Sequence, residues 1–165
     1  MAGDRPATRS VDIADQITVR GPVYNQTMCL IQEGRLCVSE LPFVSAPIPY
    51  GDTAYRGVLG LAKGRPGQTN YVKQLKADGV IDKAIVSLNF EYTNVRNLVS
   101  QVAFGEIIYT EIEGGEQGIR YYSNLGRHQW GLQIDDFLYN GKDMTNGQRS
   151  KVAIIDSANV GIMLP

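Results

Sequence analysis

The sequence predicts a mainly β protein. Glycine is abundant, with 18 residues in a chain of 165. Short apolar runs are frequent, and turn-forming residues separate them, a pattern typical of β-strands and tight turns. A single segment has the pattern of a helix. The length suits one domain or two small lobes and is sufficient to bury a core.

The apolar runs predict the strands in chain order. We expect strands over residues 13–20 and 23–32, joined at Gly21-Pro22, then over 84–91 and 100–107, connected through 92–97, then over 129–139 and 151–155. Residues 38–52 hold four prolines or glycines and are predicted as loop. Residues 57–62 read as a buried strand leading into a turn, whose glycines imply close backbone approach. Asn140-Gly141 is a strong type I′ hairpin signal.

One short helix is predicted over residues 69–77. Thr69 or Asn70 can cap its start, and Asp78-Gly79 ends it. Its apolar face is expected to consist of Tyr71, Val72 and Leu75.

Charge and composition give no indication of a nucleic-acid partner or of a membrane span. The formal net charge is −1 and no basic stripe is present, so nothing indicates a nucleic-acid partner. The longest apolar runs are far too short to span a bilayer, so no membrane span is predicted. Residues 1–10 are polar, lack the apolar stretch of a secretory signal and are expected to form a flexible tail.

Two cysteines, Cys29 and Cys37, flank a plausible hairpin turn at 33–35. If Glu33 is the centre of that turn, the two face each other across the strands, and a disulfide can form in an oxidising compartment. Two buried free thiols are the alternative. Asn25-Gln26-Thr27 matches the N-glycosylation sequon, a triplet that often arises by chance.

The final segment carries the main functional signal. The apolar run 152–155 leads to a lone carboxylate, Asp156, and then to small residues from Ser157 onward. An aspartate at the point where a buried strand gives way to a turn of small residues is a candidate functional carboxylate.

The order of these segments resembles the pepsin family of aspartic proteases. Residues 55–62 are similar to the family's F-D-G-I-L-G-L-A signature, with Arg56 in place of the aspartate. Residues 153–157 resemble its A-I-[VI]-D-[TS] segment, which holds the second catalytic aspartate. The remaining matches are 15–19 with Asn25-Gln26 to the strands past the flap, 71–81 to the following helix, 84–90 and 102–106 to the next strands, and 129–134 to the Y-W-x-x-x-L strand. The resemblance runs from residue 11 to residue 165 and covers about half of the family's chain, its middle portion.

The resemblance implies part of a pepsin-like bilobal fold with one short helix. After the tail at 1–10, residues 11–110 would form the later part of the N-terminal lobe, and 111–165 would begin the C-terminal lobe. Asp156 becomes the candidate catalytic residue, expected to be vestigial, with Ser157 as its motif neighbour. The family needs two carboxylates that share a proton and a water, one from each lobe, and this sequence matches only the second.

The motif around Asp156 also departs from the family. Ala158 replaces the glycine that lets two loops approach closely. Asn159 and Val160 replace small hydroxyl residues that hydrogen-bond around the carboxylate. These departures predict a non-catalytic homologue, a pseudoenzyme, that acts as a structural or interaction subunit, with other protein chains completing its open sheet edges.

Two alternatives stay open. The chain could be a fragment, or one chain, of an active aspartic endopeptidase that hydrolyses peptide substrates. A dimer could also bring two copies of Asp156 together, as in retroviral proteases. No cofactor or metal is predicted, because no His, Cys and carboxylate cluster has ligand spacing. Of the other candidates, His128 reads as a surface-loop residue, Trp130 as a core or lobe-boundary residue, 114–118 as a flexible loop, and Asp52, Asp135, Asp136 and Asp143 as turn or surface residues.

Overall fold

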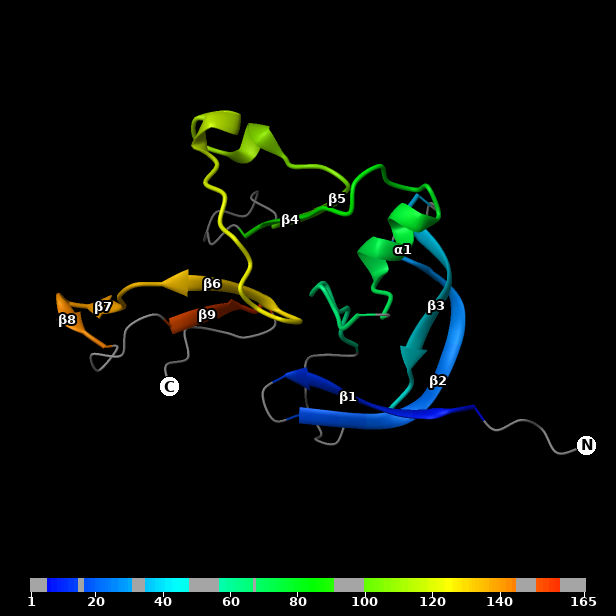
Figure 1. Cartoon of the computed structure of the whole chain (residues 1–165). Coiled ribbons are helices and arrows are strands. Elements are labelled where there is room, and N and C mark those ends of the chain that lie inside the picture. Colours follow the sequence, from blue (N-terminus) through cyan, green and yellow to red (C-terminus); the bar gives the residue numbers. More distant parts are fainter. Residues whose placement is uncertain are drawn as a thin grey trace, which may run out of the picture. The chain divides into compact units, whose positions relative to one another are not determined.

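The computed structural model describes residues 6–14, 17–30, 35–47, 57–66, 68–90, 100–144 and 151–157. In this part of the chain, nine strands, one α-helix and two short 3-10 helices form, so the prediction of a mainly β protein with one short helix is confirmed. The chain divides into two compact units (Figure 1). Residues 1–61 and 69–119 make up the first, and residues 62–68 and 120–165 make up the second.

The first unit is built on a three-stranded antiparallel sheet in the order β1-β2-β3. The strands are β1 (Thr8–Ala14), β2 (Ile17–Cys29) and β3 (Cys37–Val44). The long strand β2 pairs with β1 along its first half and with β3 along its second half (Figure 1). Strand β1 begins at Thr8, inside the segment that the sequence predicted as a tail.

Strand β2 runs without a break through Gly21-Pro22, so the prediction of two strands joined there is wrong. Pro22 is the partner of Thr8 at the end of the β1 ladder, and its carbonyl accepts a hydrogen bond from the Ser45 N–H at 3.0 Å on the β3 side. A Cβ at Gly21 would clash with the Ser45 carbonyl oxygen. The dipeptide therefore marks the point where β2 changes partners, a position that tolerates a missing N–H.

Strand β3 lies inside the segment predicted as loop, and that prediction is wrong for residues 38–44. Two non-local features hold the strand: Cys37 forms a disulfide with Cys29 directly opposite, with a Cα–Cα distance of 4.1 Å, and the Val38 and Leu41 side chains are buried. Of the four prolines and glycines counted, only Pro42 falls within β3. Of the two alternatives for the cysteines, the structure has the disulfide.

A bulge in β3 connects this strand to the helix. Ser39 and Glu40 together lie opposite Thr27, and Glu40 adopts φ of 51°. Ser39 donates two hydrogen bonds to Asp78 Oδ2, from its N–H at 2.8 Å and from its Oγ at 2.9 Å. Gln74 Nε2 donates to Asp78 Oδ1 at 2.7 Å. The backbone donor at the bulge is thus satisfied by a carboxylate at the end of the helix.

Helix α1 (Tyr71–Ala77) confirms the sequence prediction at both ends. Asn70 is the N-cap, and its Oδ1 accepts from the Lys73 N–H at 2.9 Å. Asp78 is the C-cap, and Gly79 follows with φ of 71°. The buried face consists of Tyr71, Val72 and Leu75, as predicted.

The core of the first unit lies between α1 and β3. Its buried members are Val38, Leu41, Tyr71 and Leu75, and the half-buried Met28, Leu36, Leu59, Ile81 and Phe104 pack against them. The Tyr71 hydroxyl donates to the Leu36 carbonyl, and the Tyr71 ring meets the Phe104 ring edge-on with centroids 5.7 Å apart. Burial raises the pKa of Tyr71, which keeps the phenol protonated as a donor.

Residues 57–62 do not form the predicted buried strand. The segment has no regular secondary structure, and Gly57 and Gly60 are exposed. A Cβ at either glycine would meet nothing within 4 Å, so the predicted close approach of another backbone segment is absent at both glycines. Leu59 is the residue of this segment that packs against the core.

The remainder of the first unit is a hairpin-like pair followed by two single turns of helix. Strands β4 (Val86–Asn89) and β5 (Gln101–Phe104) form within the predicted ranges but are shorter, and they pair antiparallel. The expected connection 92–97 lies outside the described residues. The 3-10 helices are η1 (Tyr109–Glu111) and η2 (Gly115–Gly118). The predicted flexible loop at 114–118 is therefore a helical turn, closed by a hydrogen bond from the Ile119 N–H to the Glu116 carbonyl at 3.3 Å.

The second unit contains two small antiparallel sheets. Strand β6 (Trp130–Ile134) pairs with β9 (Lys151–Ile155), which has the predicted bounds, and β7 (Leu138–Tyr139) pairs with β8 (Lys142–Asp143). Asn140 and Gly141, both with positive φ, form the two-residue turn between β7 and β8, as predicted. The single strand predicted over 129–139 is two strands, because the chain turns at Asp135 and Asp136. No helix in the described ranges is long and apolar enough to cross a membrane.

The Asp78 network predicts how the first unit responds to acid. The hydrogen bonds from the Ser39 backbone, Gln74 and the Ser39 hydroxyl hold the pKa of Asp78 below its ordinary value. The folded-state pKa is thus below the unfolded value of about 3.9, so the carboxylate stabilises the fold above that pH, and the contribution is lost as pH falls through the folded-state pKa. Urea unfolding of Asp78→Asn should show reduced stability at neutral pH and a difference from wild type that shrinks in acid. Asp82→Asn removes one exposed carboxylate nearby as a control, and an equal loss for both variants would contradict the assignment.

Candidate functional site

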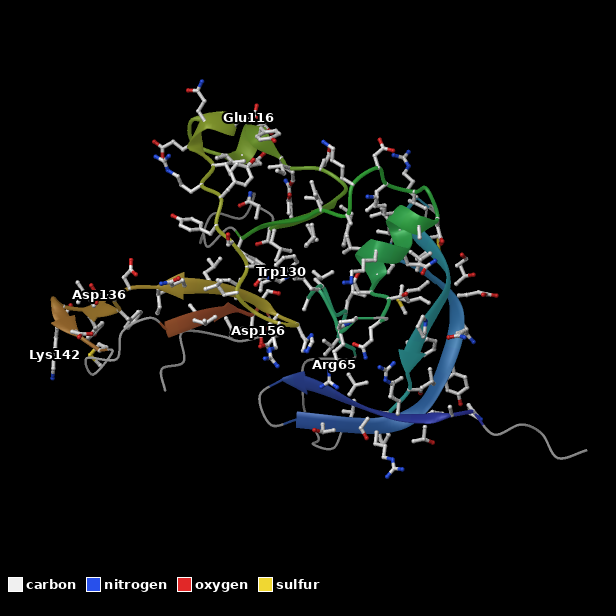
Figure 2. The ribbon with its side chains drawn as sticks, viewed as in Figure 1. Arg65, Glu116, Trp130, Asp136, Lys142 and Asp156 are labelled. Carbon is white, nitrogen blue, oxygen red and sulfur yellow. A yellow bond between two sulfur atoms is a disulfide. The ribbon has the colours of Figure 1, made fainter. Side chains whose placement is uncertain are left out.

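Asp156 follows the last residue of β9 and is exposed. The final pair of the β6–β9 ladder is Trp130 with Ile155, so Asp156 lies one residue beyond the ladder at its Trp130 end. Figure 2 shows Trp130 and Asp156 at this same end of the two-stranded sheet. The carboxylate therefore emerges where a strand stops.

Ser157 comes next, in an exposed turn. The altered motif residues Ala158, Asn159 and Val160 lie outside the described residues, as does Arg56. What the structure establishes of the motif is thus the strand, the carboxylate that ends it and the start of a turn.

Two other aspartates of the second unit lie at the far end of the same ladder. Asp135 and Asp136 follow Ile134, whose partner is Lys151, and Figure 2 shows Asp136 beyond the end of β6 opposite to Trp130. Trp130 and Ile134 are four residues apart, which at about 3.3 Å per residue separates the two ends by roughly 13 Å. A proton-sharing pair of carboxylates requires a separation of about 3 Å, so neither aspartate can pair with Asp156 within this chain.

An asparagine amide organises the chain beside the Trp130 end. Asn124 Oδ1 accepts from the Gly126 N–H at 2.8 Å and from the Gly131 N–H at 2.9 Å. Asn124 Nδ2 donates to the Gln129 carbonyl at 3.1 Å. The Leu125 N–H adds a backbone bond to the Gly131 carbonyl at 2.8 Å. The segment at Asn124 thus covers the edge of β6 where that strand begins.

Gly131 is required for this arrangement. The residue is buried, and a Cβ there would lie 2.8 Å from the Gly126 nitrogen and 2.8 Å from Val152 Cγ1. Any side chain would push the Asn124 segment away from β6 or β6 away from β9.

The residues around the ladder differ in part from expectation. His128 lies in a bend before β6, as predicted, but it is half-buried and its Nδ1 is buried without a hydrogen-bond partner. Trp130 is 40% exposed, so of its two predicted positions the core is wrong, and the lobe boundary stays a prediction. Asp135, Asp136 and Asp143 are exposed, as predicted, and Asp52 lies outside the described residues.

The first unit contains a separate hollow of about 290 Å³. It lies beside β4 and β5, and its lining residues are Lys83, Ile85, Gly105, Glu106, Ile107 and Tyr109. The Glu106 carbonyl at its margin accepts from Ser87 Oγ at 2.7 Å. The lining provides one cation, one carboxylate and one phenol on an apolar floor, without a nucleophile–base pair. Across the described ranges, no three His, Cys, Asp or Glu residues gather where they could hold a metal ion.

A scan against protein-family models found no match, and a search of curated proteins found none either.

Two side chains that do most to position these elements, Asn124 and Asp78, were not among the predicted site residues. Asn124 precedes Leu125-Gly126 in a segment without apolar periodicity, and its sequence context carries no signal for a role at a strand edge. Asp78 does carry a signal. A carboxylate at a helix C-terminus opposes the helix dipole, so its presence there indicates a compensating donor elsewhere in the fold.

Replacing Asn124 tests the organisation of the β6 edge. Asn124→Ala removes three hydrogen bonds and leaves the Gly131 N–H without its acceptor, which should cost about 1–3 kcal/mol of local stability. Asn124→Asp keeps the acceptor but loses the amide donor and should cost less. Trp130 is the single tryptophan of the chain, so its fluorescence during urea unfolding reports on β6. Equal stability of Asn124→Ala and wild type would contradict the role assigned to the amide.

Proposed function

We propose that this chain is a non-catalytic homologue of the pepsin-like aspartic proteases and acts as a structural or interaction subunit. The observation that carries the interaction role is the apolar surface of the β6–β9 sheet. The proposed ancestry has separate support, which is the order of the sequence motifs and the position of Asp156 at a strand end.

The β6–β9 sheet exposes apolar side chains on both faces. Trp130 and Ile155 form one pair, and Ile155 is 54% exposed. Ile154 and Val152 belong to the alternate face and are 45% and 47% exposed. A two-stranded sheet is marginally stable by itself in water. Burial of apolar area stabilises an association by about 25 cal/mol per Å², so a partner chain that covers these residues would stabilise both itself and the sheet.

The edge of the sheet supports the same role. Among the described residues the sheet has two strands, β6 and β9, and the Asn124 segment contacts β6 at Gly131 through its amide and the Leu125 N–H. Strand edges that keep unpaired backbone groups are templates for another strand. A partner protein that supplies a strand would therefore satisfy backbone groups and bury the adjoining apolar side chains together.

Loss of catalysis follows from the sequence around Asp156. Ala158 adds a methyl group where the family has glycine, and Asn159 and Val160 remove hydroxyl donors. Asp135 and Asp136 are too far away to act as the second carboxylate. The alternative, one chain or a fragment of an active aspartic endopeptidase, rests on the position of Asp156 as an exposed carboxylate directly after a β-strand, with the second carboxylate supplied by another lobe or chain.

A peptidase assay distinguishes the two proposals. The purified chain is incubated with a mixed peptide library at acidic pH. We expect no cleavage that is sensitive to pepstatin, and we expect Asp156→Asn to behave like wild type. Asp136→Asn is the matched control for removal of a carboxylate in the same unit. Pepstatin-sensitive cleavage that is lost in Asp156→Asn and retained in Asp136→Asn would overturn the non-catalytic assignment. Cleavage that appears only after addition of a second chain with a D-[TS]-G motif would establish the alternative.

A further inference from the structure

The β2 strand carries a sequon in a position where it can be modified. Asn25-Gln26-Thr27 is the single N-x-S/T triplet in the 165 residues, and its middle residue is not proline. All three residues are exposed in the folded protein. A sequon whose asparagine is buried cannot be glycosylated in the folded protein, and Asn25 is not buried.

Asn25 projects from the face of the sheet that does not contain the core. Its neighbours on β2 pair with the core side of β3: Gln26 lies opposite Leu41, which is buried at 6% exposure. Because successive side chains of a strand alternate between faces, Asn25 lies on the other face, opposite the exposed Pro42. In the described part of the fold, no hydrogen bond engages the exposed Asn25 side chain, so a substituent on its amide can extend into solvent.

Thr27 is also accessible. It lies at the bulge between the pairs Gln26–Leu41 and Met28–Val38, where the register shifts and Thr27 has no single partner. The hydroxyl of the third sequon residue is required for acceptor recognition, and here it is exposed beside a local irregularity of the ladder.

The disulfide supplies an independent observation about the environment. Cys29 lies two residues beyond Thr27 on β2 and is bonded to Cys37 of β3. Structural disulfides form and persist in oxidising compartments such as the endoplasmic reticulum lumen and are rare in the cytosol. That compartment is also where asparagine receives oligosaccharide. The sequon and the disulfide are different chemistries that indicate the same route.

We propose that Asn25 is an N-glycosylation site. In this reaction Asn25 Nδ2 attacks C1 of the first sugar of a lipid-pyrophosphate-linked oligosaccharide. The C1–O bond to the pyrophosphate breaks, the lipid pyrophosphate leaves with the bonding electrons, and the amide loses one proton to a base of the transferase. No oxidant or reductant is consumed.

This modification would also determine which surfaces stay available. A hydrated oligosaccharide on Asn25 covers the outer face of the β2–β3 hairpin around Pro42 and Val44. It therefore prevents this face of the first unit from binding other proteins. The proposal stands independently of the protease-like ancestry.

Site mapping in the cells that produce the protein tests the proposal. The full chain should shift in one step on gels after treatment with a peptide-N-glycosidase. When the enzyme acts in heavy-oxygen water, peptide mass spectrometry should find labelled aspartate at position 25. Asn25→Gln and Thr27→Ala should abolish the shift, and Thr27→Ser should retain it.

Asn140→Gln is the matched control, since Asn140 is an exposed asparagine outside a sequon, and it should keep the shift. The Thr27→Ser variant distinguishes loss of the acceptor from loss of folding. Recovery of unmodified Asn25 from the wild-type protein, or a shift that persists in Asn25→Gln, would overturn the proposal.

Discussion

The first unit depends on the contact between Tyr71 of α1 and the end of the β2–β3 hairpin. The Tyr71 side chain is 1% exposed, its hydroxyl donates to the Leu36 carbonyl, and its ring meets Phe104 of β5. One residue thus joins the helix, the disulfide-linked hairpin and the β4–β5 pair. Leu75, one turn further along α1 and fully buried, extends the same contact toward Val38 and Leu41. Because a buried phenol needs an acceptor, this contact sets the distance between α1 and the hairpin as well as contributing apolar burial.

Elements with local determinants were predictable from the sequence. The cap residues and apolar spacing of α1 lie within a few positions of one another, and Asn140-Gly141 specifies its turn by its own backbone preference. Strand β3 was missed because its determinants are distant: the bond to Cys29 and the packing of Val38 under α1. For residues 57–62 the error was the opposite one: a strand was predicted and none forms. An apolar, glycine-containing run reads as a buried strand, and no local feature reveals that Leu59 alone is used by the core.

The position of Asp156 could be predicted from the sequence, but the hydrogen bonds that hold the neighbouring strand could not. An apolar run that ends at a carboxylate placed Asp156 at the end of β9. The amide of Asn124 holds the β6 edge through Gly126, Gln129 and Gly131, contacts that depend on how a segment without periodicity folds back. The exposure of Trp130 has a related cause, because an aromatic residue on a two-stranded sheet has too few neighbours within its own unit to be buried. Patterns in the sequence indicate which residues are apolar, and only the fold shows which of them remain uncovered.

The proposed function is that of a protein whose carboxylate motif no longer supports catalysis and whose two-stranded β6–β9 sheet, with its exposed apolar side chains, binds a partner. The most direct measurement is hydroxyl-radical footprinting of Trp130, Val152 and Ile154, comparing the purified chain with the protein in its native preparation. The account predicts strong labelling of all three in the isolated chain and reduced labelling in the native preparation, where a partner covers β6 and β9. Equal labelling in both, with a native mass equal to that of one chain, would contradict the interaction role.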